Sequence, residues 1–319
     1  MKDHSLLKGG MGSSALGPGL SRLKLFLALS RTPHGLLDLA TPSMAALLWL
    51  GAFPPPVIIL MGLITGFAGY TAVYALNDLV DYRVDREKIC QGGLGGGDYL
   101  DAVFVRHPVA QGLLTFREGV GWALTWAGVA LVGAYLLNPV CAFIFLMGGV
   151  LEAVYCRMLH VSHWRTLVSG VVKTLGGIAA VFAVDSRPAI FFLVPLFLWL
   201  FFWEIGGQNV PADWHDLEED RQWQARTVPV VYGPQGASKI ILLSLAISVA
   251  LSLMVLRIAP ARLSGLHLGL TLVAGLALLI WPASRLYRTQ AQADASRIFN
   301  RASYYPAAIL AIILASFIC

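Results

Sequence analysis

The stretch that decides the fold is NDLVDYRVDREK, residues 77–88, which directly follows a long apolar run and is rich in carboxylates. Its three aspartates are spaced i, i+3 and i+7, and an arginine follows the third. The same spacing recurs in ADWHDLEEDR, residues 212–221, again with an arginine after the third aspartate. The two triplets are Asp78, Asp81, Asp85 and Asp213, Asp216, Asp220.

At 100° per residue, positions i, i+3 and i+7 fall within about 60° of one another around an α-helix. Each triplet therefore predicts one acidic stripe on one helix. The windows 78–87 and 213–220 together hold half of the chain's 18 acidic residues, so the negative charge is concentrated in two places.

The rest of the chain is strongly apolar, with 57% hydrophobic and 13% charged residues among 319. Apolar runs of about 20 residues are long enough to cross a bilayer as helices. The sequence predicts an all-α membrane protein that forms a single domain over residues 1–319, with nine transmembrane helices. The predicted spans are 35–53, 54–77, 117–138, 139–156, 164–184, 187–208, 237–257, 264–284 and 301–319.

The basic residues predict the orientation of these spans. With nine spans and a cytoplasmic N-terminus, only Arg187, Arg257 and Arg262 lie in outer loops and Lys173 lies within a span, so the remaining Lys and Arg residues lie on the inner side. Anionic inner-leaflet lipid accounts for the net charge of +5, and we expect no nucleic-acid partner. Residues 1–34 are expected to be cytoplasmic or interfacial, without a removable signal peptide.

The two triplets follow the second and sixth spans, which both run inward, so both are expected at the cytoplasmic side. Facing stripes of like charge repel one another unless cations lie between them. Carboxylate oxygens suit Mg²⁺, which often shares its shell with substrate phosphates. The sequence therefore predicts a metal-bound diphosphate, although the spacing does not specify which one. The four cysteines show no disulfide or zinc spacing.

At these residues the sequence resembles the UbiA superfamily of intramembrane prenyltransferases. NDLVDYRVD matches the family's first motif, NDxxDxxxD, and ADWHDLEED matches its second, DxxDxxxD. The resemblance implies a helical bundle of nine membrane spans and transfer of a polyprenyl chain from its diphosphate to a hydrophobic acceptor, most often an aromatic quinone precursor. It also implies that two Mg²⁺ ions bind to the six aspartates, which act as catalytic and metal-binding residues.

Further residues are expected near the substrate. Lys173 lies roughly 13 Å inside the fifth span, a depth at which a charged group is expected to contact the diphosphate or acceptor, or to pair with a structural carboxylate. Tyr74 lies one turn before Asp78, where its ring either stabilises a developing cation or packs in the core. The candidate substrate-binding residues are Asn77, Arg86, Lys88, Arg157, Lys173, Arg221, Arg226 and Tyr74.

Two local features depart from the expected pattern. Pro211 precedes the second triplet, so we expect the sixth span to end near Gln208 and the triplet to lie on a separate short helix. His107-Pro108 stands where many members of the resembled family carry Arg-Pro, which leaves Arg106 as a possible substitute contact to the diphosphate.

Two other functions remain open at this point. A cyclase of the same superfamily would ionise the same diphosphate without an acceptor, and a membrane transporter could use the acidic stripes as a cation site. The position of the stripes at helix ends disfavours the transporter, because transport sites lie near the midplane. We expect an integral protein of the cytoplasmic membrane; the sequence specifies neither acceptor, chain length nor oligomeric state.

Overall fold

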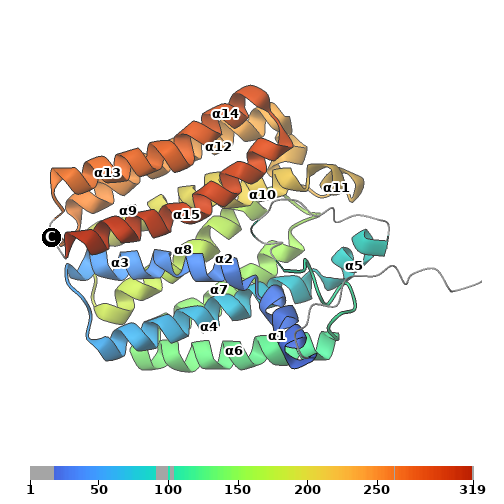
Figure 1. Cartoon of the computed structure of the whole chain (residues 1–319), viewed down its shortest axis with the longest axis horizontal. Coiled ribbons are helices and arrows are strands. Elements are labelled where there is room, and N and C mark those ends of the chain that lie inside the picture. The colour runs from blue at the N-terminus through green and yellow to red at the C-terminus, as the bar shows by residue number, and fades with distance from the viewer. Residues whose placement is uncertain (1–17, 91–99, 101–103, 262, 318–319) are drawn as a thin grey trace, which may run out of the picture.

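The computed structural model describes residues 18–90, 100, 104–261 and 263–317, and the elements formed by these residues are helices (Figure 1). In the N-terminal half they are α1 Pro18–Leu29, α2 Thr32–Asp38, α3 Ala40–Leu50, α4 Pro56–Val80, α5 Tyr82–Cys90, α6 Phe116–Leu137 and α7 Pro139–Arg157. In the C-terminal half they are α8 Arg165–Val184, α9 Ile190–Trp203, η2 Glu204–Asn209, α10 Val210–His215, α11 Leu217–Gln222, α12 Val228–Ile258, α13 Gly265–Gly275, η3 Leu276–Ile280, α14 Trp281–Thr289 and α15 Gln292–Ser316.

Eight helices in the described part of the chain are long and apolar enough to cross a membrane. They coincide with the second to ninth predicted spans. The first predicted span, 35–53, is divided into α2 and α3 at Leu39. The break has a local cause, because Pro42 lacks an N–H and its ring crowds the carbonyl of Asp38 four residues earlier. Helix length in the described residues therefore does not establish the predicted count of nine.

The long helices run side by side along the length of the molecule, and the short helices α5 and α11 lie together at one end (Figure 1). The largest buried cluster lies among α3, α9, α12 and α15, and most of its side chains are aliphatic. Trp199 and Trp214 are almost completely buried in it. This packing joins the N-terminal α3 to the C-terminal half and includes Val210 and Trp214 of α10.

The prediction that the sixth span ends near Gln208 is wrong. Helical structure continues from Ile190 to His215, and residues 204–209 form a π-helical turn, η2. A π-turn adds one residue to the helical path, and it absorbs the backbone disturbance caused by Pro211 instead of ending the helix. Asp213 is consequently carried on α10 as a direct continuation of a membrane-length helix.

Gly206 in η2 allows this turn to pack closely against α12. A Cβ atom at Gly206 would lie 2.9 Å from the carbonyl oxygen of Ile241 and equally close to side-chain atoms of Ser244 and Leu245. The carbonyl oxygen of Ile241 belongs to the backbone, so it cannot rotate away as a side chain could. Glycine at this position therefore permits the helix contact that positions the second triplet.

We expect Gly206→Ala to lower the melting temperature of the purified protein in detergent, because α12 must move away from η2. Overpacking of this kind costs about 1–3 kcal/mol. Gly269→Ala on α13 is the matched control, since no atom lies within 4 Å of its added Cβ. Equal melting temperatures for Gly206→Ala and the unmodified protein would refute the close approach.

Candidate active site

Both aspartate triplets fold in the same way, with a break at the middle aspartate. Asp81 ends α4 with φ −85° and ψ −2°, and Asp216 separates α10 from α11 with φ −96° and ψ 13°. These angles lie in the sparsely populated bridge region, which is frequent in active sites. The expectation of one acidic stripe on one continuous helix is therefore corrected to two helix ends per triplet.

Helical hydrogen bonds nevertheless resume directly at each break. The amide of Asp85 donates to the carbonyl of Asp81 at 3.0 Å, and the amide of Asp220 donates to that of Asp216 at 2.8 Å. The second helical segment of each triplet thus begins at the middle aspartate itself. The bend lets the first and third aspartates of each triplet face the same space from two successive helices.

All six aspartates line one cavity of about 150 Å³ at the end of the bundle that contains α5 and α11. Four basic residues from separate parts of the sequence also line this cavity, and so does one histidine. These residues are Arg31, Lys88, Arg106, Arg165 and His107.

The second triplet is neutralised by three of these cations. Arg165 donates from Nη1 to Oδ1 of Asp213 at 3.2 Å, and Lys88 Nζ lies 3.6 Å from Oδ1 of Asp220. Both pairs have side chains less than one-tenth exposed. Ion pairs this deeply buried are expected to hold the carboxylates in place, because breaking one leaves an uncompensated charge.

Arg106 pairs with the middle aspartate of the second triplet. Its Nη2 donates to Oδ2 of Asp216 at 2.6 Å. Burial raises the pKa of Asp216, but the guanidinium of Arg106, together with the nearby His215 and Lys88, holds that pKa below its usual value. Asp216 is therefore ionised at neutral pH.

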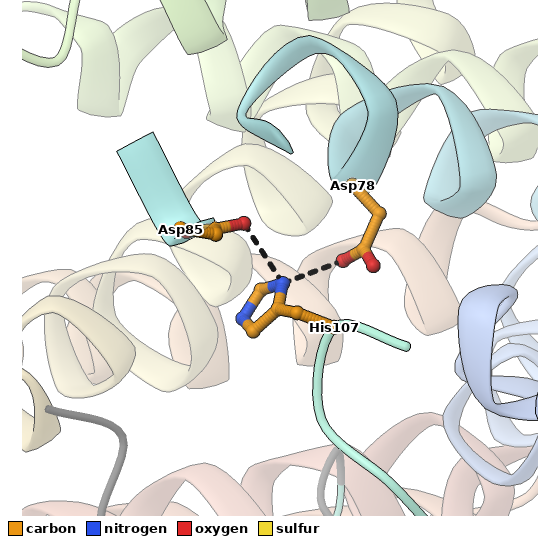
Figure 2. Close-up of side chains that lie close together, drawn as sticks. All are labelled: Asp78, Asp85 and His107. Atoms are coloured by element: carbon orange, nitrogen blue, oxygen red, sulfur yellow. Dashed lines mark ion pairs between the residues drawn. The ribbon is translucent and has the colours of Figure 1, made fainter. Parts of the chain in front are cut away.

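His107 approaches the first triplet from the loop that precedes α6. Its Nδ1 lies 2.8 Å from Oδ1 of Asp78 and 2.9 Å from Oδ2 of Asp85, and Figure 2 shows both contacts ending on the same ring nitrogen. Burial lowers the pKa of His107, but these two carboxylates raise it to about 9. Burial, and then the neighbouring Asp85, raises the pKa of Asp81 to about 6.

The donor set fits divalent cations. Six carboxylates surround the cavity, and one oxygen of Asp213 and one of Asp85 are buried without a hydrogen-bond partner among the described residues. Burying a carboxylate oxygen without a hydrogen-bond partner costs free energy, and carboxylate oxygens are the ligands that hard cations such as Mg²⁺ prefer. Asp78, Asp85 and His107 also offer three potential ligand atoms within 4.8 Å of one another.

A second, larger cavity of about 510 Å³ extends from this site into the bundle. Its wall is mostly apolar and includes residues of α3, α4, α7 and α8. Arg31, Asn77, Tyr155 and Ala212 line both cavities, so the charged and apolar spaces adjoin. Together they suit a ligand with one highly charged end and one apolar chain.

A polar cluster lies in the wall of the apolar cavity one helical turn below Asp78. Lys173 Nζ lies 2.5 Å from Oδ2 of Asp38 and 2.6 Å from the Tyr74 hydroxyl. The Tyr74 hydroxyl donates to the same carboxylate at 2.5 Å. Lys173 thus pairs with a buried carboxylate, which is one of the two roles predicted for it. It also lines the apolar cavity.

Two buried glutamates lie near the same cavity. Glu152 accepts a hydrogen bond from Nδ2 of Asn77 at 2.8 Å, and Glu204 accepts one from Ser169 at 2.7 Å. Asn77 also accepts from Arg31 at 3.2 Å, so it links the first motif to both cavities.

The predicted site residues are divided between these cavities and the surface. Lys88 lines the charged cavity, Lys173 and Tyr74 line the apolar cavity, and Asn77 lines both. Four basic residues line neither cavity and have exposed side chains: Arg86, Arg157, Arg221 and Arg226. Arg86 contacts Tyr82 and Arg221 contacts Glu218, each on its own helix or turn.

Sequence reasoning did not single out Arg31 or Arg165 as site residues. Arg31 lies in the left-handed conformation, φ 44°, between α1 and α2, and its Nη2 is 3.7 Å from Asp78. Arg165 begins α8 and its guanidinium lies 4.1 Å from the centre of the Tyr155 ring. Each looked like an ordinary basic residue at a membrane surface, and only the packing of distant segments brings it to the aspartates.

This bundle of membrane-length helices, with a carboxylate-lined cavity at one end and an apolar cavity beside it, defines an integral membrane protein with an amphipathic binding site. The chain belongs to the UbiA prenyltransferase family, whose family model matches residues 39–304. The resemblance carried by the two aspartate motifs is thereby confirmed.

Relatives within this family are distant in sequence and close in fold. The digeranylgeranylglyceryl phosphate synthase of Thermococcus sibiricus is 26% identical over 281 residues, covering 86% of this chain and 91% of that protein. A UbiA homologue of Aeropyrum pernix K1 is 17% identical with a TM-score of 0.68, covering 89% of this chain and 97% of the other. A homologue from Archaeoglobus fulgidus, described as bound to DMAPP and Mg²⁺, is 19% identical with a TM-score of 0.65, covering 91% and 99%.

We expect Lys173→Met to destabilise the protein, because the Asp38 carboxylate would stay buried without its nearest cation. Breaking a buried pair on one side costs about 3–5 kcal/mol. The double variant Lys173→Met/Asp38→Asn should regain much of the loss, and melting temperatures in detergent would measure both. If the single variant melts like the unmodified protein, the pair is not a structural requirement.

Proposed function

We propose that this protein transfers a polyprenyl chain from its diphosphate to a hydrophobic acceptor at the cytoplasmic side of the membrane. The observation that carries the proposal is the junction of the two cavities. The charged cavity suits a diphosphate with divalent cations, and the adjoining apolar cavity suits an isoprenoid chain. Arg31 and Asn77 line both cavities and would lie beside the bond that joins the diphosphate to the chain.

The six aspartates would hold two Mg²⁺ ions, Asp78, Asp81 and Asp85 on one side and Asp213, Asp216 and Asp220 on the other. When bound, Mg²⁺ would neutralise the diphosphate and make it a better leaving group. A UbiA homologue of the same fold is described as bound to GPP and Mg²⁺, which supports the use of Mg²⁺.

Arg31, Lys88 and Arg165 would bind the diphosphate oxygens as the allylic C–O bond breaks. The bonding electron pair leaves with the diphosphate, and positive charge develops on the allylic carbon. Preorganised cations that face developing negative charge lower the barrier most effectively in a site shielded from water. All three line the charged cavity.

Aromatic rings at the junction would face the positive charge on the chain. Tyr155 lines both cavities and Tyr74 lines the apolar one. The faces of such rings attract cations. A new bond then forms between the allylic carbon and the acceptor, and the acceptor loses a proton. Glu152, which lines the apolar cavity, is the proposed destination of that proton.

The first proposed acceptor class is an aromatic ring of a quinone precursor. A second is a prenylated glyceryl phosphate, favoured by the 26% identity to a synthase named for such a product.

The decisive experiment incubates the purified protein in detergent with geranyl, farnesyl or geranylgeranyl diphosphate, with and without Mg²⁺. Aromatic and glyceryl phosphate acceptors are added in parallel, and diphosphate release and products are measured by mass spectrometry. Prenylated acceptor formed only with Mg²⁺ would support the transferase. Cyclised hydrocarbon without acceptor would replace it by a cyclase, and no release under any condition would reopen a cation transporter.

Replacing one carboxylate from each triplet should abolish turnover. We expect Asp78→Asn and Asp213→Asn each to lower the rate at least about 100-fold, because each removes a carboxylate that would hold the cation beside the leaving diphosphate. Each variant also leaves a buried cation without its charged partner, Arg165 beside Asp213 and His107 beside Asp78, so turnover is compared well below each variant's own melting temperature.

Glu218→Gln is the matched control for these variants. Glu218 lies in the same acidic window but its side chain is 71% exposed and pairs with Arg221 on the surface. Normal turnover in either aspartate variant, or equal loss in the control, would contradict the proposed metal site.

A further inference from the structure

The contact between His107 and the first triplet has the geometry of a metal coordination shell. Two ligand atoms at right angles around an ion, each about 2.1 Å from it, lie about 3 Å apart. Nδ1 of His107 lies 2.8 Å from Asp78 and 2.9 Å from Asp85, close to that spacing, and all three ligand atoms lie within 4.8 Å of one another.

The same contact is a poor set of hydrogen bonds. One ring nitrogen carries at most one hydrogen, so it cannot donate fully to two carboxylates. Nδ1 of His107 and Oδ2 of Asp85 are both buried, and neither makes a hydrogen bond of normal geometry in the described part of the chain. The side chains of both residues are nine-tenths buried. An ion between them would satisfy all three groups.

The backbone holds His107 in this place. Its φ of 50° is left-handed, and a histidine in that region indicates a local constraint. The carbonyl of His107 accepts a bond from Gln111 N at 3.0 Å. Val109 and Leu114, on the same loop, are buried against Leu79, the residue after Asp78. The loop is thus packed onto the helix end that carries the first aspartate.

We propose that His107 is a direct ligand, through Nδ1, of the cation held by Asp78 and Asp85. The first triplet then forms a mixed nitrogen and oxygen site, whereas the second triplet offers oxygen ligands. Imidazole favours transition metals over Mg²⁺, and it coordinates as the neutral ring through the lone pair of Nδ1. The first site should therefore prefer Mn²⁺ or a later divalent metal, which deepens the proposed function and rests on its metal dependence.

The distinction matters because an arginine, the residue expected here from the family resemblance, cannot do the same. A guanidinium has no lone pair available for coordination and remains charged. His107→Arg would preserve an ion pair with Asp78 and Asp85 while abolishing coordination. The two roles of His107, cation and ligand, are thereby separable.

The test is pulsed electron paramagnetic resonance of the full-length protein in detergent with Mn²⁺ and inorganic diphosphate, without prenyl substrate. The unmodified protein should show coupling of Mn²⁺ to a directly bonded ¹⁴N nucleus, and labelling the histidines with ¹⁵N should change that coupling. His107→Asn and His107→Arg should lose it and bind Mn²⁺ at least about tenfold more weakly, with a smaller change for Mg²⁺.

His215→Asn is the matched control, because His215 precedes Asp216 yet its Nδ1 contacts Ser296 at 2.8 Å. It should retain the nitrogen coupling. Bound Mn²⁺ without nitrogen coupling in the unmodified protein, or coupling that survives in His107→Arg, would overturn the proposal. Nitrogen coupling in a protein that transfers no prenyl group would support the ligand and refute only the proposed reaction.

Discussion

Mutual repulsion of six carboxylates around one small cavity is the constraint on which the rest of this structure depends. Cations drawn from distant parts of the chain offset it: Arg165 beside Asp213, Lys88 beside Asp220 and Arg106 beside Asp216. Lys88 belongs to the first motif segment and Asp220 to the second, so this pair ties the two halves together. The fold therefore keeps the aspartates in ion pairs with basic residues, and a substrate bound with its cations can replace these pairs.

The middle aspartate of each triplet gives the site its shape. Because α4 ends at Asp81 and α10 ends near Asp216, each triplet spans a bend rather than a straight helix. A straight helix would place the third aspartate about 10 Å along its axis from the first. The bend lets both face one cavity, and the helical backbone bonds that Asp81 and Asp216 make on both sides of it limit its cost.

The sequence was sufficient to predict what depends on spacing and hydropathy. The repeated triplets, the spans that carry them and the family followed from local patterns, and the structure places all six aspartates around one cavity. Contacts that depend on tertiary packing were not predictable. Arg31 and Arg165 carry no spacing signal, and the effect of Pro211 was misjudged because a π-turn adjacent to it leaves the helix continuous.

The gradient of polarity along the two cavities fixes how an amphipathic substrate must lie. The aspartates and their cations occupy one end, and the Lys173–Asp38 pair, which is close to neutral overall, lies one helical turn deeper. Beyond it the wall is apolar. A substrate bound in reverse would place a diphosphate against hydrocarbon and strip it of both water and counter-charge, which costs far more than any contact could return. The orientation of the chain is therefore set by desolvation, and the residues at the junction have only to align the reacting carbon.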